Sequence, residues 1–463
     1  MAGKPRSLWQ SLPEGRRGWL QGARGTVMLE ALAAASSLDV PIETLRGRSV
    51  LLIVRDPLVA ALAMIELDGF ARRMVLCPPD LAAQYLPGVI ACAATEVCVR
   101  GSQDPPAPAA PLLLQVTAQA TLRAAAVDRA GCEPTEWVLL TSGTTGAPKL
   151  VVHDFGSLIS AFSDDARESL PPIWTTFYDN RRYGGLQILL RGLLQGSVVL
   201  PDEAEPLEAF LTRAAETGVT HISGTPSHWR RALMSGIART ISPRYVRLSG
   251  EIADQGILNA LRTAYPSAII AHAFASTEAG VAFEVRDGIE GFPRSLLETA
   301  GQAVELAVRG GTLRVRSPGN ARGYLRDGLE PLTQPDGFVD TGDRLELNNG
   351  RYRFMGREGG TINVGGLKVH PEEIEAVLNA HPAVRMSRVT ARRSPITGAV
   401  VAAEVVLTQE AAGETPQAPA EALIPELTER CRRTLAAYKV PALIRIVPTL
   451  DVSASGKLLR PDA

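Results

Sequence analysis

The chain has 463 residues, of which 45% are hydrophobic and 21% are charged, and its 48 basic and 49 acidic side chains give a net charge of −1. This length exceeds what one hydrophobic core usually supports, so more than one domain is expected. The composition is typical of a soluble globular protein, and the balanced charge excludes a general attraction to nucleic acid or anionic membranes.

Segments near the N-terminus do not predict membrane insertion or secretion. The longest apolar run there, residues 57–65, has about half the length that crosses a bilayer. The basic start of the chain reaches Pro13, Glu14 and Arg16 without an apolar stretch, which disfavours a secretory signal. The five cysteines include no C-x-x-C pair, so neither disulfides nor a zinc site is predicted, and a reducing, cytoplasmic location is expected.

The first half of the chain alternates strand and helix patterns. Residues 50–54 and 74–76 predict buried strands, and Asp56 and Pro57 predict the N-cap and first residue of an apolar helix that extends to about Ile65. Further short core strands are expected at 137–141, 197–200, 220–223 and 268–273. This alternation predicts an α/β fold with layered sheets.

The pattern changes toward the C-terminus. From Thr312 on, alternating segments and glycine turns predict a β-rich subdomain. Residues 372–378 predict a helix, 400–407 a strand, and 425–437 a second helix with Pro425 at its start, which together indicate a small α+β domain. The glycines near residue 357 favour a boundary there, with residues 1–357 as a large N-terminal domain and 358–463 as a mobile C-terminal lid.

The clearest chemical signal is the segment TSGTTGAPK at residues 141–149, directly after a predicted strand. Its backbone N–H groups and hydroxyls suit phosphate oxygens, and Lys149 adds a mobile cation. Only five of the basic residues are lysines, which singles out Lys149 and Lys457 as cations not replaced by arginine. By itself such a loop is more often a surface turn, and its glycines are too close together for the Walker spacing.

Five motifs in order resemble those of the adenylate-forming superfamily, which includes acyl- and aryl-CoA synthetases, luciferases and the adenylation domains of nonribosomal peptide synthetases. They are SGTTGAPK at 142–149, FASTE at 274–278, DTGD at 340–343, the hinge segment at 356–375, and SGK at 455–457. The resemblance is weakest before residue 130. It implies an enzyme that joins a carboxylate to ATP, releases pyrophosphate and passes the acyl group to a thiol.

The resemblance implies roles for the matching residues. Lys457 would bridge the carboxylate and the α-phosphate as the catalytic lysine, Thr277 would face the α-phosphate, and Glu278 would bind Mg²⁺ together with Thr144. The phosphate-binding residues would be Thr141, Ser142, Gly143, Thr144, Thr145, Gly146 and Lys149. The adenosine-binding residues would be Ser249, Gly250, Glu251, Phe274, Ala275, Asp343 and Arg357. Phe274 stands where the family usually has tyrosine, so stacking can persist without the phenol hydroxyl.

The hinge, the thiol channel and the acyl pocket are less clear. Gly359 occupies the hinge position, where most relatives carry Asp or Lys. Gly365, Gly366 and Lys368 resemble the segment that lines the pantetheine channel, although a plain β-turn explains them equally well. The acyl-pocket candidates are Tyr178, Arg181, Tyr183 and His228. Arg181 and Arg182 could orient an anionic substrate or the CoA phosphates, or cap a surface loop. For a residue such as His228, a buried structural role is the more frequent one.

These motifs predict a ligase that converts a carboxylic acid, ATP and CoA into acyl-CoA, AMP and pyrophosphate, with an aryl or medium-length acyl acid. The expected partners are therefore a small carboxylic acid, ATP, Mg²⁺ and CoA, without nucleic acid or membrane, and a homodimer stays open. One alternative keeps adenylation but delivers the acyl group to a phosphopantetheine carrier protein. Another is a catalytically silent adenylate-binding regulator, suggested by Phe274 and Gly359, against which the two retained lysines Lys149 and Lys457 argue.

Overall fold

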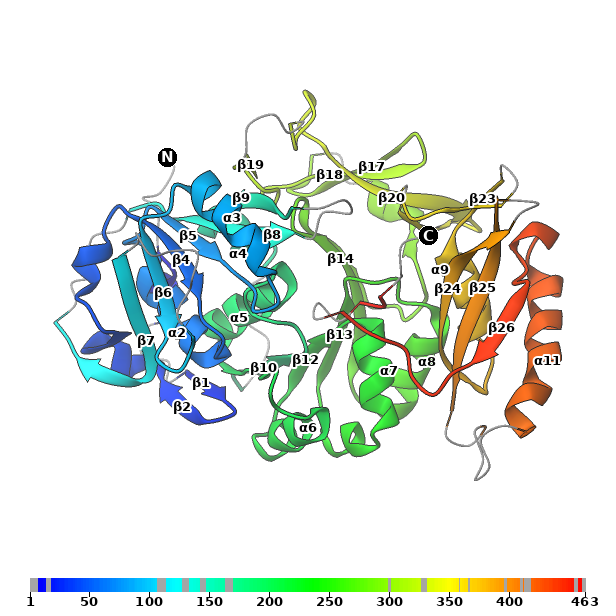
Figure 1. Cartoon of the computed structure of the whole chain (residues 1–463), viewed down its shortest axis with the longest axis horizontal. Coiled ribbons are helices and arrows are strands. Elements are labelled where there is room, and N and C mark those ends of the chain that lie inside the picture. The colour runs from blue at the N-terminus through cyan, green and yellow to red at the C-terminus, as the bar shows by residue number, and fades with distance from the viewer. Residues whose placement is uncertain are drawn as a thin grey trace.

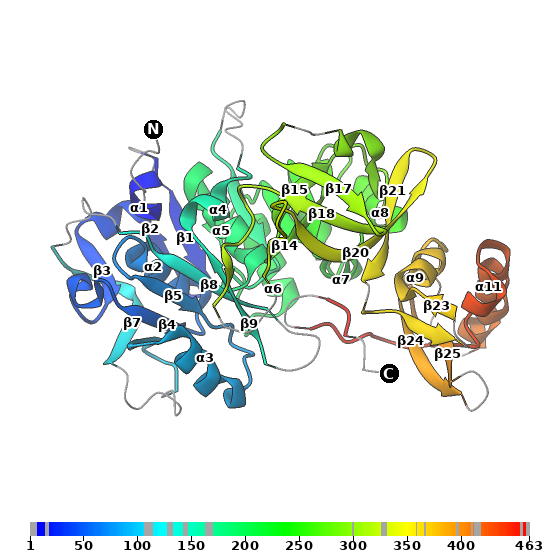
Figure 2. The same ribbon diagram turned by 90° about the horizontal axis from the view of Figure 1, so that it is seen from above.

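The computed structural model describes residues 7–13, 18–105, 114–126, 133–141, 147–162, 170–298, 301–325, 331–357, 359–364, 367–394, 398–408, 411, 418–453 and 457–459. Two large sheets form most of the N-terminal part, a smaller β-sheet lies beside them, and a separate α+β unit lies at the opposite end of the molecule (Figure 1). Figure 2 shows the same succession from above. The α/β class predicted from the alternating pattern is confirmed.

The first large sheet is mixed, with parallel strands in its middle and antiparallel strands at both edges. In spatial order its strands are β15 (Gly280–Val285), β14 (Ile269–Ser276), β13 (Tyr245–Ser249), β12 (His221–Gly224), β10 (Ile173–Thr176), β11 (Ser197–Val199), β1 (Trp19–Gly22) and β2 (Gly25–Met28).

The second large sheet is also mixed. Its strands are, in spatial order, β19 (Gly323–Tyr324), β9 (Lys149–His153), β8 (Glu136–Thr141), β5 (Arg73–Leu76), β4 (Ser49–Ile53), β6 (Val97–Gly101), β7 (Leu114–Ala124) and β3 (Ala35–Leu38).

Helices fill the space between the two large sheets and cover their outer faces. Helix α2 (Pro57–Leu67) is buried along its whole length and packs with α5 (Tyr183–Gln195) into one core with both sheets. Its sequence is apolar on every side, as expected for a helix enclosed between sheets. The predicted cap is confirmed, since the Asp56 carboxylate accepts from the backbone of Leu58 and Val59.

The remaining helices of the N-terminal part flank this core. Helices α6, α7 and α8 pack against one outer face and α3 against the other. Their bounds are α1 (Leu8–Ser11), α3 (Leu86–Ala93), α4 (Phe155–Ile159), α6 (Leu207–Glu216), α7 (Pro226–Met234) and α8 (Gln255–Ala264). Short 3-10 turns lie at η1 (Leu29–Ala33), η2 (Ile42–Leu45), η3 (Ala83–Tyr85), η4 (Ile237–Thr240) and η5 (Arg294–Leu297).

The predicted β-rich subdomain is a five-stranded antiparallel sheet built around an aromatic core. Its strands are, in spatial order, β16 (Phe292–Pro293), β21 (Arg351–Arg357), β20 (Val339–Asn348), β18 (Thr312–Arg316) and β17 (Glu305–Arg309).

The C-terminal unit has its own hydrophobic core, drawn from residues 362–446. Its elements are the hairpin β22 (Ile362–Val364) and β23 (Leu367–Val369), α9 (Pro371–Asn379), β24 (Val384–Ser394), β25 (Gly398–Leu407), α11 (Ala418–Thr434), η6 (Ala437–Lys439) and β26 (Leu443–Ile446). Strand β21 ends at Arg357, immediately before this unit. The domain boundary after Arg357 stays a prediction.

One predicted boundary is wrong. The second C-terminal helix was expected to begin at Pro425, but α11 begins at Ala418 and contains Pro425 in its interior. A proline inside a helix removes one backbone hydrogen bond, and the packing of Leu427 and Cys431 into the C-terminal core compensates for that loss.

Among the described residues, no helix is long and apolar enough to cross a membrane.

Candidate active site

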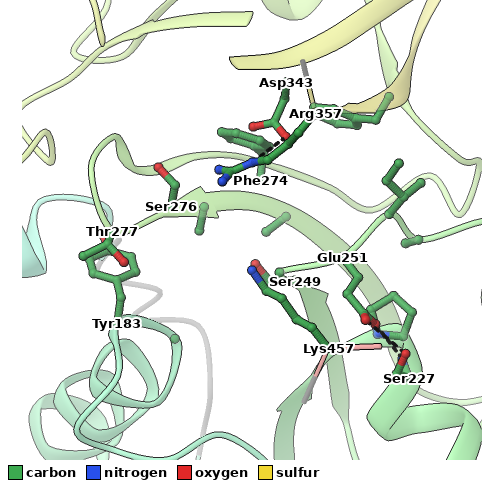
Figure 3. A pocket seen from close by; sticks show the side chains of 18 of the residues that line it. Tyr183, Ser227, Ser249, Glu251, Phe274, Ser276, Thr277, Asp343, Arg357 and Lys457 are labelled. Atoms are coloured by element: carbon green, nitrogen blue, oxygen red, sulfur yellow. Dashed lines mark hydrogen bonds and ion pairs between the residues drawn. The ribbon is translucent and has the colours of Figure 1, made fainter. Parts of the chain in front are cut away.

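A cavity of about 860 Å³ lies between the N-terminal part of the chain and the C-terminal unit. Strand ends of the first sheet, the five-stranded antiparallel sheet, helix α9 and the segment that carries Lys457 all contribute to its wall. Figure 3 shows Phe274, Asp343, Arg357 and Lys457 around this space. The predicted site residues that line it are Thr141, Lys149, Tyr178, Tyr183, Ser249, Gly250, Glu251, Phe274, Ala275, Thr277, Glu278, Asp343, Arg357 and Lys457. Residues separated by more than 300 positions in the sequence thus meet around one space.

The position of the cavity follows from the strand topology. Thr141, Ser249 and Ser276 are the last residues of β8, β13 and β14, and all three line the cavity. Ligands of α/β sheets commonly bind beyond the carboxyl ends of the strands, where loops diverge. Gly250, directly after β13, has a φ of +85°, a conformation that side-chain-bearing residues rarely adopt.

A buried histidine fixes the turn that carries Thr277 and Glu278. The Nε2 atom of His153 lies 2.7 Å from the carbonyl oxygen of Thr277, and its Nδ1 lies 3.0 Å from the Ser157 hydroxyl. Burial lowers the pKa of His153 to about 4, so the ring is neutral near pH 7. Because a carbonyl only accepts, Nε2 carries the proton and Nδ1 accepts from Ser157.

Three of the residues predicted to bind adenosine form an aromatic face and an ion pair at one side of the cavity. Phe274 stacks on Phe354 with ring centroids 5.3 Å apart and an interplanar angle of 6°. Asp343 of β20 pairs in register with Arg357 of β21, and Arg357 Nε donates to the carboxylate over 3.4 Å. Burial raises the pKa of Asp343, against the opposing effect of Arg357. A flat ring beside a carboxylate suits a base and the ribose hydroxyls attached to it.

Lys457 enters the cavity from the C-terminal tail, which runs from β26 back toward the first sheet (Figures 1 and 3). Burial and the nearby Arg357 lower the pKa of Lys457, whereas Glu251, Asp343 and Glu278 act in the opposite direction. The ammonium group therefore lies among charges of both signs inside a partly desolvated space, where each charge interacts more strongly than it would in water.

Lys149 and Glu278, which the motifs predict to bind phosphate and Mg²⁺, also line the cavity. Lys149 is exposed, with its Nζ 5.2 Å from the ring centroid of Tyr324. In the part of the chain that the structure describes, no group of three His, Cys, Asp or Glu side chains could hold a metal unaided. Mg²⁺ is commonly held by one or two carboxylates together with substrate phosphates, so Glu278 fits that role. Ser142, Gly143, Thr144, Thr145 and Gly146 lie outside the described residues.

The structure places Arg181 outside the cavity, which corrects its assignment to the acyl pocket. Its guanidinium is buried and forms a two-pronged ion pair with Asp179, at 2.6 and 2.7 Å. The same group donates to the backbone carbonyls of Val54 and Arg55. These partners already occupy the guanidinium, so Arg181 connects the segment before α5 to the end of β4 and does not face a ligand.

His228 also lies behind the cavity wall, as the structural interpretation of this residue anticipates. It is the third residue of α7, where it forms a capping box with Thr225 and stacks on Phe177. Burial lowers its pKa to about 3. Tyr178 and Tyr183 do line the cavity, and the Tyr178 hydroxyl donates to the Ser249 carbonyl over 2.6 Å.

Of the hinge and channel candidates, the structure describes Gly359 and Lys368, and neither lines the cavity. Gly359 is exposed, and no atom lies within 4 Å of the place where a Cβ would stand. Lys368 is exposed on β23. Gly365, Gly366 and the residues Ser455 and Gly456 before Lys457 lie outside the described residues, so the channel assignment stays a prediction.

Sequence reasoning missed several residues of the cavity wall. Arg230 and Asp254 come from the N-terminal unit, and Glu372, Glu375 and Asn379 come from one face of α9. Asp254 could be recognised only as the cap of α8, because its second partner, Arg230, is 24 positions away. The spacing of the three α9 residues was visible, but no local signal indicates which face of the helix meets another domain.

Two family models match the chain. A model described as AMP-binding enzyme matches residues 92–325, and one described as AMP-binding enzyme C-terminal domain matches residues 373–457. These two regions include the motifs at 142–149, 274–278 and 455–457, whereas Asp343 and Arg357 lie between the two matches.

The chain is also similar to curated proteins and to solved structures. The chain is 32% identical to a 2-succinylbenzoate–CoA ligase of Salmonella typhimurium over 54% of its own length and 53% of the relative, so it spans about half of that protein. It is 27% identical to the enzyme of that name from Bacillus velezensis, over 71% and 68% of the two chains. A crystal structure of the anthranilate CoA ligase AuaEII with anthranoyl-AMP superposes with a TM-score of 0.77 at 19% identity, covering 97% and 94%. This last likeness shows the shared fold.

Proposed function

The chain belongs to the AMP-binding enzyme family, and from this premise we propose that it is an AMP-forming ligase of carboxylic acids. In the first step a carboxylate attacks the α-phosphate of ATP, forming an acyl-adenylate and releasing pyrophosphate. In the second step the sulfur of CoA attacks the acyl carbon, and AMP leaves.

The observation that carries this proposal is the place of Lys457 in the same cavity as Thr277, Glu278 and Asp343. A carboxylate is a weak nucleophile and the α-phosphate is anionic, so the first step depends on positioning and charge neutralisation. An ammonium brought in from a separate unit can neutralise charge between the two reactants without occupying the space of either one.

The other cavity residues take complementary roles in the proposal. Asp343 accepts hydrogen bonds from the ribose hydroxyls, Phe274 offers a face to the adenine, and Lys149 faces the leaving pyrophosphate. Glu278 would hold Mg²⁺, which supplies charge stabilisation to the phosphates when bound.

The relatives support the substrate class within this proposal. The named ligases act on 2-succinylbenzoate and anthranilate, both aromatic acids activated with CoA. We therefore place an aryl acid first and a medium-length acyl acid second, with CoA as the acceptor.

The test is a pyrophosphate-release assay over a panel of aryl and aliphatic acids, each with and without CoA. We expect release that requires ATP and one class of acid, with an acyl-CoA product when CoA is present. Lys457→Ala should slow release to a small residual rate, whereas Arg445→Ala, which removes an exposed cation of the same unit outside the cavity, should leave it unchanged.

Other outcomes separate the alternatives. Release without thioester formation on CoA, but with loading of a phosphopantetheine carrier protein, would favour the carrier-dependent ligase. Silence of the wild-type chain on every acid, with AMP binding retained, would overturn the ligase proposal in favour of a regulator.

A further inference from the structure

The carboxylate of Glu251 holds backbone and side-chain donors from two distant parts of the chain. Its Oε1 accepts from the backbone N–H of Leu458 over 2.9 Å, a contact that spans 207 positions in the sequence. The same carboxylate accepts from Ser227, at 2.9 Å from the backbone N–H and 3.1 Å from the hydroxyl. Ser227 lies at the start of α7, and Figure 3 shows its contact with Glu251 beside Lys457.

In the tail that presents Lys457, residues 452–453 pair with residues 457–458. Val452 and Leu458 form an antiparallel bridge, and Ser453 and Lys457 exchange hydrogen bonds of 2.7 and 3.1 Å. These contacts fix the shape of the tail but not its place in the cavity. The bond from Leu458 to Glu251 does connect the tail to the N-terminal unit, one residue away from the catalytic lysine.

Apolar packing supports the same placement. Leu458 and Met234, the last residue of α7, both pack against a small buried cluster that contains Leu450 of the tail, so this cluster joins both units. Such packing is not directional, so it brings the tail near α7 without setting its rotation. A hydrogen bond to a carboxylate is directional and strong, and it can set the direction in which Lys457 points.

We propose that Glu251 is a positioning residue that docks the C-terminal tail and aims Lys457 at the reacting atoms during adenylation. This inference rests on the proposed ligase function. It reassigns the Glu251 carboxylate from adenosine binding to tail docking, because its oxygens are directed at Ser227 and Leu458.

The proposal predicts different effects of losing Glu251 on the two half-reactions. Docking matters only in the step that uses Lys457, so losing Glu251 should slow adenylation and spare thioester formation from supplied acyl-adenylate. A residue that only stabilises α7 would affect both steps, or neither. Ser227→Ala tests that alternative, because it removes the hydroxyl contact on α7 and leaves the bond to the tail.

The experiment compares Glu251→Ala and Glu251→Gln with the matched control Glu216→Gln, an exposed carboxylate at the end of α6 that does not line the cavity. Adenylation is followed by ATP–pyrophosphate exchange, and the second step by thioester formation from synthetic acyl-adenylate and CoA. A hydrogen bond to a charged group corresponds to roughly a 10- to 100-fold change. We expect that loss in exchange for Glu251→Ala, a smaller loss for Glu251→Gln, and wild-type second-step rates for both.

Two further measurements make the test independent of overall activity. In a Lys457→Ala background, Glu251→Ala should cause no additional loss of exchange, because the two residues act through one contact. Amide hydrogen exchange in the tail peptide covering 450–459 should be faster in Glu251→Ala than in the wild type, with Ser227→Ala unchanged.

The opposite results overturn the inference. Equal loss in both half-reactions, additive losses in the Lys457→Ala background, or unchanged tail protection would show that Glu251 does not dock the tail. A wild-type chain without exchange on any acid would instead contradict the proposed function, and the tail-protection measurement would still decide the docking contact.

Discussion

The charge of Lys457 depends on its surroundings in the cavity. Burial and Arg357 lower the pKa of its ammonium, and Glu251, Asp343 and Glu278 limit that decrease. Because the proposed first step uses the protonated form, adenylation should decline as pH rises through this lowered pKa, at a pH below the ordinary lysine value of 10.5. The step from supplied acyl-adenylate should not share this alkaline limb.

A pH profile of both half-reactions tests this. Lys457→Arg should be slower than the wild type but lack the alkaline limb, since a guanidinium stays protonated to above about pH 12. A limb that persists unchanged in Lys457→Arg would assign the titration to another group.

His153 offers a second prediction at the residue scale. His153→Phe removes the donor to the Thr277 carbonyl and leaves a buried acceptor unsatisfied, which commonly costs about 1–3 kcal/mol. We expect the KM for ATP with Mg²⁺ to rise by about tenfold and the KM for the acid to stay unchanged. His153→Gln, whose amide can donate as Nε2 does, should restore most of the loss.

The contact should also be insensitive to pH over the working range. The His153 pKa is lowered to about 4, so the neutral ring persists above about pH 5. Equal effects of His153→Phe on both KM values, or no recovery in His153→Gln at matched thermal stability, would point to general loosening of the fold.

At this scale the sequence is informative where a motif is local. Thr277 and Glu278 are adjacent in the chain, and the motif that contains them identifies both. Arg181 resembled a substrate-binding arginine because its partners, the carbonyls of Val54 and Arg55, lie more than 120 positions earlier. A sequence without an alignment contains no sign of such a distant contact.

At the scale of elements, strands and helices with local signals were predictable. The expected strand at 50–54 corresponds to β4 (Ser49–Ile53), and the helix after Asp56 is α2. The start of α11 was missed because proline favours a first turn, whereas here the packing of Leu427 and Cys431 keeps it in the helix interior. Tertiary packing overrode the local preference.

The turn between β14 and β15 gives a prediction for one glycine. Gly280 has a φ of +69°, and an added Cβ would lie 2.4 Å from the carbonyl oxygen of Gly319. Gly280→Ala should therefore destabilise the fold by about 1–3 kcal/mol, and it should weaken adenylation because Thr277 and Glu278 belong to this turn.

A matched variant distinguishes the backbone strain at Gly280 from the steric clash of an added Cβ with Gly319. Gly301 has a φ of +84° with no atom within 4 Å of an added Cβ, so Gly301→Ala carries the backbone strain alone. Urea unfolding should show a clearly larger loss for Gly280→Ala. Equal losses would mean that the approach of Gly319 does not constrain the turn.

At the scale of the whole molecule, the sequence predicted two units and a lysine delivered from the second one. The surface by which the units meet was not predictable, because its contacts join α7 and α8 to α9 and β24. Asn379 donates to Asp254 over 3.3 Å, and Arg230 and Arg385 donate to each other's carbonyl oxygens. These residues are polar, and polar residues of this kind usually lie on a solvated surface.

This interface supports a final prediction. Arg385→Ala removes two hydrogen bonds that Arg385 donates to the Arg230 carbonyl, at 3.0 and 3.3 Å. Burial and the cations Arg230 and Arg239 lower the pKa of Arg385, so relief of repulsion offsets part of the loss. A net change of about 1–2 kcal/mol corresponds to roughly a 5- to 30-fold shift away from the docked arrangement.

Solution scattering and half-reaction assays measure that shift together. Arg385→Ala should increase the radius of gyration and slow ATP–pyrophosphate exchange, while thioester formation from supplied acyl-adenylate proceeds at the wild-type rate. Arg433→Ala, which removes an exposed arginine of α11 whose ion pair is with Glu429, is the control and should change neither. If Arg385→Ala slowed exchange without expanding the molecule, the arginine pair would act on the cavity wall through Arg230 and not on domain docking.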